Sequence, residues 1–138
     1  MTAISLTAAQ IRAMTENGAV VRPYAAGEEL TIGNCVYVDT DGDVMQADAS
    51  AVASARGIGI VVEGISSETT INSGERCSVC VFGPVSGFSS MVPGANEYVS
   101  DTAGGLDTAA GTCSRIMGYA ERAGVLFVHP EQNDPSST

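Results

Sequence analysis

The sequence contains no lysine and no tryptophan, and its only histidine is His129. Without lysine, the chain has no side chain for a Schiff base or for the phosphate contact of a Walker-type loop. A nucleophile activated by histidine would depend on His129 alone, which we expect to lie exposed near the end of the chain. Gly57 and Gly59 lack the third glycine of a dinucleotide-binding fingerprint. We therefore expect no enzyme and no cofactor.

Positive charge is scarce as well. The 138 residues include 6 arginines and 16 acidic residues, for a net charge of -10. Such a surface repels phosphate backbones and anionic lipids, so we expect neither a nucleic-acid nor a membrane partner. The first ten residues have neither a basic region nor a long apolar stretch, so we expect no secretion signal. We expect the protein to be made in the cytoplasm.

The chain has four cysteines, which in a reducing compartment are expected to be buried thiols. Cys77 and Cys80 have the spacing of a zinc knuckle, but on a strand residues i and i+3 face opposite sides. Cys35 and Cys113 stand alone in the sequence. Small hydrophobic side chains in a core are the favoured interpretation, and we expect no metal site.

An acidic run at residues 39–43 (DTDGD) looks like part of a calcium loop. An EF-hand loop needs glycine at position 6 and a bidentate glutamate at position 12. Counted from Asp39, these positions hold Val44 and Ser50. The Asp-Gly pair instead favours a solvated hairpin turn between two strands.

What the sequence does contain predicts an all-β fold. Sixteen glycines imply many turns, and the core must consist of Val, Ile, Ala and Leu because aromatic residues make up only 5% of the chain. We expect a small β-barrel or β-sandwich at 17–129, a short helix or arm at 1–16 and a disordered tail at 130–138. Strands are predicted at 19–21, 30–38, 44–47, 57–62, 76–82 and 125–128.

The first 16 residues have the pattern of a short helix. Thr7 and Gln10 fit a capping box, and Ile11 and Met14 are spaced i, i+3 on one side. Two interpretations stay open: the segment docks on its own domain, or it is an arm that reaches a neighbouring subunit.

An internal repeat relates the two halves of the chain. Leu30 and Met91 are 61 residues apart, and at the same offset glycine, tyrosine and valine recur at 33, 37 and 38 and at 94, 98 and 99. Each copy continues with a turn, at 41–43 or 103–105, and with a glycine-centred strand, IGI at 58–60 or MGY at 117–119. Two similar hairpin-plus-strand units would remove their exposed edges by closing into one barrel or sandwich.

In order and spacing, these segments resemble the capsid cement (head decoration) proteins of tailed bacteriophages. The resemblance covers about residues 18–128 and is carried by 33–44 (GNCVYVDTDGDV), 47–49 (ADA), 57–60 (GIGI), 83–85 (GPV), 93–95 (PGA), 98–105 (YVSDTAGG) and 117–120 (MGYA). It implies a β-tulip-like domain that assembles as trimers on the outer capsid surface and bridges major capsid protein subunits. The family has no catalytic residues to carry over.

Two functions are therefore weighed. The first is a virion decoration protein whose partners are the major capsid protein and its own copies, as a homotrimer. We place candidate contacts at Ile11 and Met14 and, in an apolar segment at 85–94 that looks exposed, at Phe88 and Met91. The second is a small β-barrel binding module of a phage fibre or tail that binds a receptor or glycan, a class in which exposed aromatic side chains are common.

Overall fold

The computed structural model describes residues 3–65, 68–132 and 135–137, and this part of the chain contains no α-helix. The all-β prediction is confirmed. In the same part, no helix is long and apolar enough to cross a membrane. The elements are β1 (Ser5–Leu6), η1 (Ala8–Gln10), β2 (Arg12–Ala13), η2 (Thr15–Asn17), β3 (Val20–Ala25), β4 (Leu30–Thr31), β5 (Cys35–Val38), β6 (Val44–Gln46), β7 (Gly59–Gly64), β8 (Thr70–Ile71), β9 (Arg76–Ser86), β10 (Phe88–Ser89), β11 (Asn96–Val99), β12 (Leu106–Asp107), β13 (Cys113–Ser114), β14 (Ile116–Arg122), β15 (Val125–Val128) and β16 (Ser136–Ser137).

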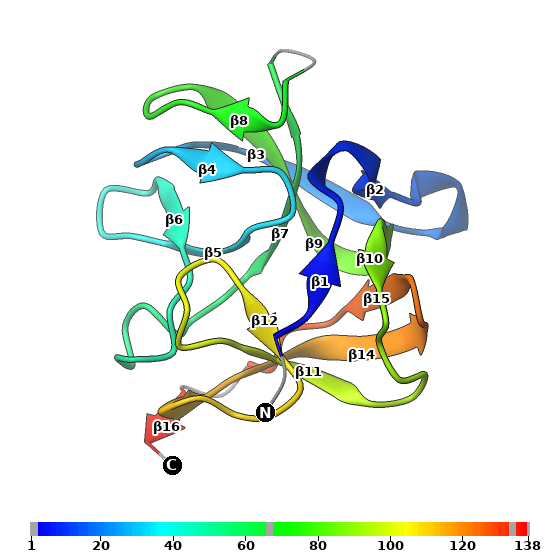
Figure 1. Cartoon of the computed structure of the whole chain (residues 1–138). Coiled ribbons are helices and arrows are strands. Elements are labelled where there is room, and N and C mark those ends of the chain that lie inside the picture. Colours follow the sequence, from blue (N-terminus) through cyan, green and yellow to red (C-terminus); the bar gives the residue numbers. More distant parts are fainter. Residues whose placement is uncertain (1–2, 66–67, 133–134, 138) are drawn as a thin grey trace.

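One strongly curled antiparallel sheet forms most of the molecule and encloses the core like half of a barrel (Figure 1). Its strands follow the order β12-β11-β14-β15-β9-β7-β5-β6, and β2 and β3 also pair with β9. Three small two-stranded sheets, β1-β10, β4-β8 and β13-β16, complete the described structure.

Strand β9 joins the two halves of this sheet. Its first part pairs with β7, and its last part pairs with β15, from Ser86 opposite Val125 to Gly83 opposite Val128. Gly83 has a positive φ of 106°, which glycine adopts without steric cost. Proline follows it, so this part of the strand lacks one backbone donor. The strand can therefore change partners in the middle of the sheet.

The repeat is present in the topology. In the first unit (β5, β6, β7 and the first part of β9), Val38 pairs with Val44 and Val36 with Gly59. The second unit (β11, β12, β14 and β15) has the same pairing. Val99 and Glu97, which lie 61 residues after Val38 and Val36, pair with Leu106 and Gly118 at the matching turn and glycine-centred strand. Read inward from its two ends, the sheet has the order β6-β5-β7-β9 on one side and β12-β11-β14-β15 on the other. The strands of the two units are therefore arranged in the same order.

The central glycine of each unit is required by the close approach of two strands. A Cβ atom on Gly59 would collide with the carbonyl oxygen of Cys80, and one on Gly118 with that of Phe127. The neighbouring strand is β9 in the first unit and β15 in the second. The same packing constraint therefore explains both glycines that the repeat had marked.

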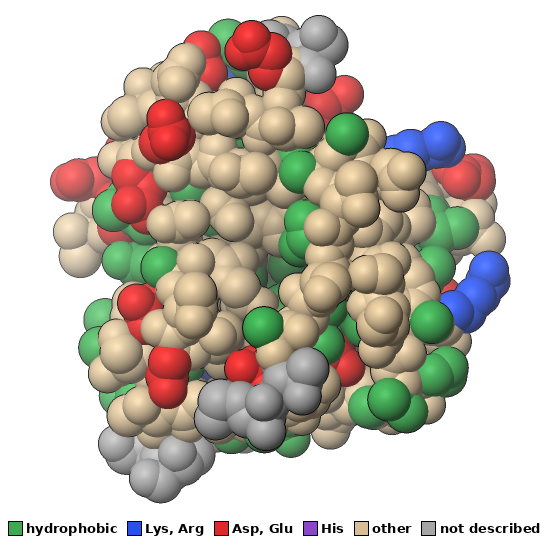
Figure 2. Space-filling view, viewed as in Figure 1, with side chains coloured by type: hydrophobic (Ala, Val, Ile, Leu, Met, Phe, Trp, Pro, Cys, Tyr) green, Lys and Arg blue, Asp and Glu red, His purple; other side chains and the backbone are tan. Residues whose placement is uncertain are grey.

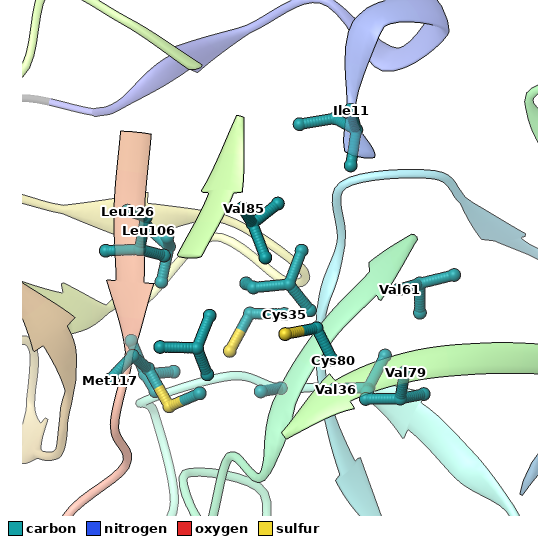
Figure 3. Packing of buried hydrophobic residues seen from close by; sticks show 14 of the residues in the cluster. Ile11, Cys35, Val36, Val61, Val79, Cys80, Val85, Leu106, Met117 and Leu126 are labelled. Carbon is teal, nitrogen blue, oxygen red and sulfur yellow. The ribbon is translucent and has the colours of Figure 1, made fainter. Parts of the chain in front are cut away.

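Aliphatic side chains and thiols fill the core, as the composition predicted. Figure 3 shows Cys35, Cys80, Val85, Met117 and Leu126 directed into the space inside the curled sheet. All five have at most 1% of their surface exposed.

The N-terminal segment differs from its prediction. It forms β1, β2 and two single 3-10 turns, and the side chain of Thr7 makes no capping hydrogen bond. The backbone N–H of Thr7 donates to Gly87 O (3.0 Å) and that of Met14 to Pro84 O (2.9 Å). Pairing with β9 and β10 of the same chain satisfies donors that a helix would have used internally, and it holds the segment on its own domain.

The C-terminal tail also differs where the structure describes it. Ser136 and Ser137 of β16 pair with Ser114 and Cys113 of β13. Pro130 and Pro135 are buried. This part of the predicted disordered tail is tied to the domain, whereas residues 133–134 and 138 lie outside the described residues.

Candidate partner-binding surface

Three of the four predicted contact residues belong to the core. Ile11 and Phe88 are each 6% exposed and Met91 is 3% exposed, while Met14 is half-buried. The predicted exposure of the apolar segment at 85–94 was therefore wrong for Phe88 and Met91. The physical reason is local pairing: the N–H of Phe88 donates to Gly124 O (3.3 Å) and that of Met91 to Ala123 O (3.1 Å), which turns both side chains inward.

The acidic run at 39–43 is a hairpin turn, as expected. An Asp39 carboxylate oxygen, Oδ1, accepts hydrogen bonds from the backbone N–H of Asp41 (2.9 Å) and Asp43 (3.0 Å). Gly42 has a φ of 87°, which suits its place in the turn. In the described part of the chain, no three His, Cys, Asp or Glu side chains are grouped as metal ligands would be.

All four thiols are free and buried. Burial raises the pKa of Cys35 to about 12, against a smaller lowering effect of the Arg115 charge. Burial also raises the pKa of Cys77 and of Cys80. Because the thiolate is the reactive form, these groups are poor nucleophiles in the folded protein.

Glu97 is a buried carboxyl group that the sequence interpretation missed. Its side chain is fully buried, and neither oxygen has a hydrogen-bond partner within the described residues. Burial raises the pKa of Glu97 to about 7, and the nearby charge of Asp107 contributes in the same direction. The repeat could have identified it, because the corresponding residue of the first unit is the buried Val36.

A cluster of exposed rings lies on the outer side of the second unit. Phe82 and Phe127 meet edge to face with centroids 5.2 Å apart, and Phe82 meets His129 in the same way at 5.5 Å. Tyr119 stacks on Phe127 at 5.3 Å and 21° between the ring planes. Phe82 is 42% exposed, Tyr119 39%, Phe127 half-buried and His129 exposed. We call these four side chains the aromatic face.

The cross-strand row that contains Tyr119 and Phe127 has a counterpart in the first unit. In the first unit, the cross-strand row Cys35, Ile60 and Cys80 is completely buried by the rest of the chain. The corresponding row of the second unit is Asn96, Tyr119 and Phe127, and the described chain leaves it open. The row thus has the same register in both units, but in the first unit it faces the interior of the molecule and in the second it carries exposed rings on the outer side.

A hollow of about 340 Å³ adjoins the aromatic face at His129. Ile116 and Pro130 provide apolar walls, and Glu131 provides a carboxylate. One oxygen of Glu131, Oε1, accepts a hydrogen bond from the backbone N–H of Ile116 (2.8 Å), which holds the carboxylate in place. An apolar wall beside a fixed negative charge suits the long side chain of arginine or lysine.

Figure 2 shows acidic side chains spread over the face of the molecule that is drawn, with basic side chains at its right-hand edge. The single ion pair found among the described residues joins Arg12 and Glu16 at 4.0 Å between exposed side chains. Arg115 is buried instead, and its Nη2 donates to Gly57 O (2.9 Å). Over the whole sequence, 16 acidic residues face 6 basic ones.

The chain was also compared with known proteins. No protein-family model matches it, and no curated protein matches it.

Proposed function

We propose that the chain is a structural, non-enzymatic protein of a bacteriophage virion. In this proposal it is made in the host cytoplasm, assembles as a homotrimer on the outside of the capsid and stabilises the shell by bridging major capsid protein subunits. A closed, β-tulip-like arrangement of the two units is part of the proposal. Many weak contacts over a lattice would give such a protein strong overall binding.

One observation carries the proposal. Four of the segments that carry the resemblance to capsid cement proteins, 33–44, 57–60, 98–105 and 117–120, overlap the paired strands of two units of equal strand order and register. These parts of the resemblance belong to the framework of the fold. The curled all-β sheet and the acidic surface are compatible with a protein packed at high density on a particle.

The direct test is reconstitution. Purified protein is mixed with expanded, undecorated heads of the phage that encodes it, and the heads are imaged by electron cryomicroscopy, with untreated heads as the control. We expect added density at threefold or quasi-threefold lattice positions and a higher temperature of head disruption. Heads without added density would contradict the proposal.

A receptor- or glycan-binding module of a fibre or tail is the second candidate, and the exposed aromatic face favours it. Copy number separates the two candidates. Quantitative mass spectrometry of purified virions should give hundreds of copies per particle for a decoration protein and only a few for a fibre or tail module.

A further inference from the structure

We propose that the aromatic face and the adjoining hollow form the surface on which the chain binds a separate protein that presents apolar side chains together with arginine or lysine. This inference rests on the proposed function, under which the partner is the major capsid protein. It adds the location of the contact and the chemistry of the partner side.

The rings of the aromatic face are exposed or half-buried in the described chain. Exposed rings in contact with one another form a continuous apolar area, unlike single hydrophobic side chains scattered over a surface. In the first unit, the corresponding row is completely buried. Large aromatic side chains that the fold of their own chain leaves exposed are suited to burial against another molecule, where such residues contribute most to binding.

Carboxylates lie beside the aromatic face. Two copies that met through this face would bring the carboxylates of Glu131 and Glu121 on both sides together, so self-association at this face is disfavoured. Ring faces attract cations, and Glu131 in the hollow adds a carboxylate. The exposed Glu121 follows Tyr119 by two residues on β14. A basic partner surface is complementary to all three features.

The aromatic face is less suited to a glycan than to a protein. Glycan sites combine an aromatic platform with several polar groups that fix the hydroxyls in a concave site. The aromatic face offers one hydroxyl, on Tyr119, and one imidazole, on His129, along the outer side of a sheet. A protein surface is the better match, with an arginine or lysine as the side chain that enters the hollow.

The test uses two surface variants and a matched control, measured on the expanded heads. Phe82→Thr/Tyr119→Thr removes two exposed rings and puts threonine, a residue that strands favour, in their place. Glu131→Gln removes only the charge and keeps the oxygen that accepts from Ile116. Val38→Thr/Val92→Thr alters two hydrophobic side chains that are exposed outside the aromatic face, at 39% and 66%.

We expect the double ring variant to bind heads about 10-fold more weakly or worse, and the control to bind like the unmodified protein. Glu131→Gln should weaken binding at 0.15 M salt and reduce its dependence on salt. Thermal melting checks that each variant folds, and the single variants Phe82→Thr and Tyr119→Thr replace the double variant if it does not.

The outcomes separate the two proposals. If the unmodified protein gives no density on heads, the proposed function fails and the assigned partner fails with it. If it binds and both surface variants bind within about twofold of it, the function stands and this surface is wrong. Self-association in sedimentation, or binding to lipopolysaccharide vesicles, that is lost in the ring variant would also overturn the assignment, in favour of a second copy or a glycan.

Discussion

A single buried carboxyl group gives the fold a testable dependence on pH. Glu97 occupies a position that is apolar in the other unit, and its folded-state pKa of about 7 lies above the ordinary value of 4.5. The folded chain therefore binds more protons than the unfolded chain between these pH values. The stability contribution of Glu97 is present at low pH and is lost as the pH rises through that window.

We expect Glu97→Gln to be more stable than the unmodified protein at pH 8, by about 1–3 kcal/mol, and nearly equal at pH 4. Urea unfolding at both pH values measures the difference. Glu121→Gln, at an exposed site, is the control and should show a small effect of the same size at both. A Glu97→Gln difference that does not change with pH would mean that folding does not raise the pKa of Glu97.

The thiols give a second residue-scale prediction. Burial with a raised pKa keeps Cys35, Cys77 and Cys80 protonated and inaccessible. We expect a disulfide-exchange reagent such as Ellman's reagent to react with the native protein very slowly and with all four cysteines at once in denaturant. Fast reaction of one thiol in the native protein would locate an opening of the core that the structure does not contain.

In each unit, the glycine at 59 or 118 allows its strand to lie close to the backbone of the neighbouring strand. We expect Gly59→Ala and Gly118→Ala each to lower the free energy of unfolding by about 2 kcal/mol or more, because the added methyl group meets a backbone carbonyl that cannot move freely. Gly94→Ala is the control: its φ is 88° but the space around it is open, and a cost of about 1 kcal/mol is expected. Equal losses at all three sites would contradict the packing argument.

The docking of the N-terminal segment on its own domain is tested in a similar way. Ile11 is 6% exposed, and Gly87 leaves no room for a Cβ atom against it. We expect Ile11→Ala to cost about 2–4 kcal/mol in stability and Met14→Ala, at a half-buried position, about 1 kcal/mol. If Ile11→Ala melts like the unmodified chain, the segment does not stay on its own domain in solution.

At the scale of the strands and turns, the sequence was sufficient to predict those features that depend on local alternation, on turn residues and on the internal repeat. The hairpin at 39–43, the Gly59 and Gly118 strands and the repeat register follow from alternation and turn residues. The short helix that was one of the two possibilities at 1–16 does not form, because the pairing partner of this segment, at 84–88, is 70 or more residues away and no local pattern reports it. The aromatic face was missed for the same reason, since Phe82, Tyr119 and Phe127 meet only after β9, β14 and β15 pair.

At the scale of the whole molecule, β9 pairs with β7 of the first unit and with β15 of the second, so the two units share one continuous sheet. We therefore expect the chain to unfold in one cooperative transition, with equal calorimetric and van't Hoff enthalpies. Two separate heat-absorption peaks would indicate that the units fold independently in spite of the shared strand.

The open row of the second unit also has an evolutionary meaning. If the two units arose by duplication, the row Cys35, Ile60 and Cys80 is constrained by the interior of the molecule, whereas the row Asn96, Tyr119 and Phe127 can follow changes in the surface that it contacts. One copy thus preserves the architecture while the other is free to specialise. In a library of random substitutions selected only for folding, residues 96, 119 and 127 should accept many amino acids, and residues 35, 60 and 80 very few.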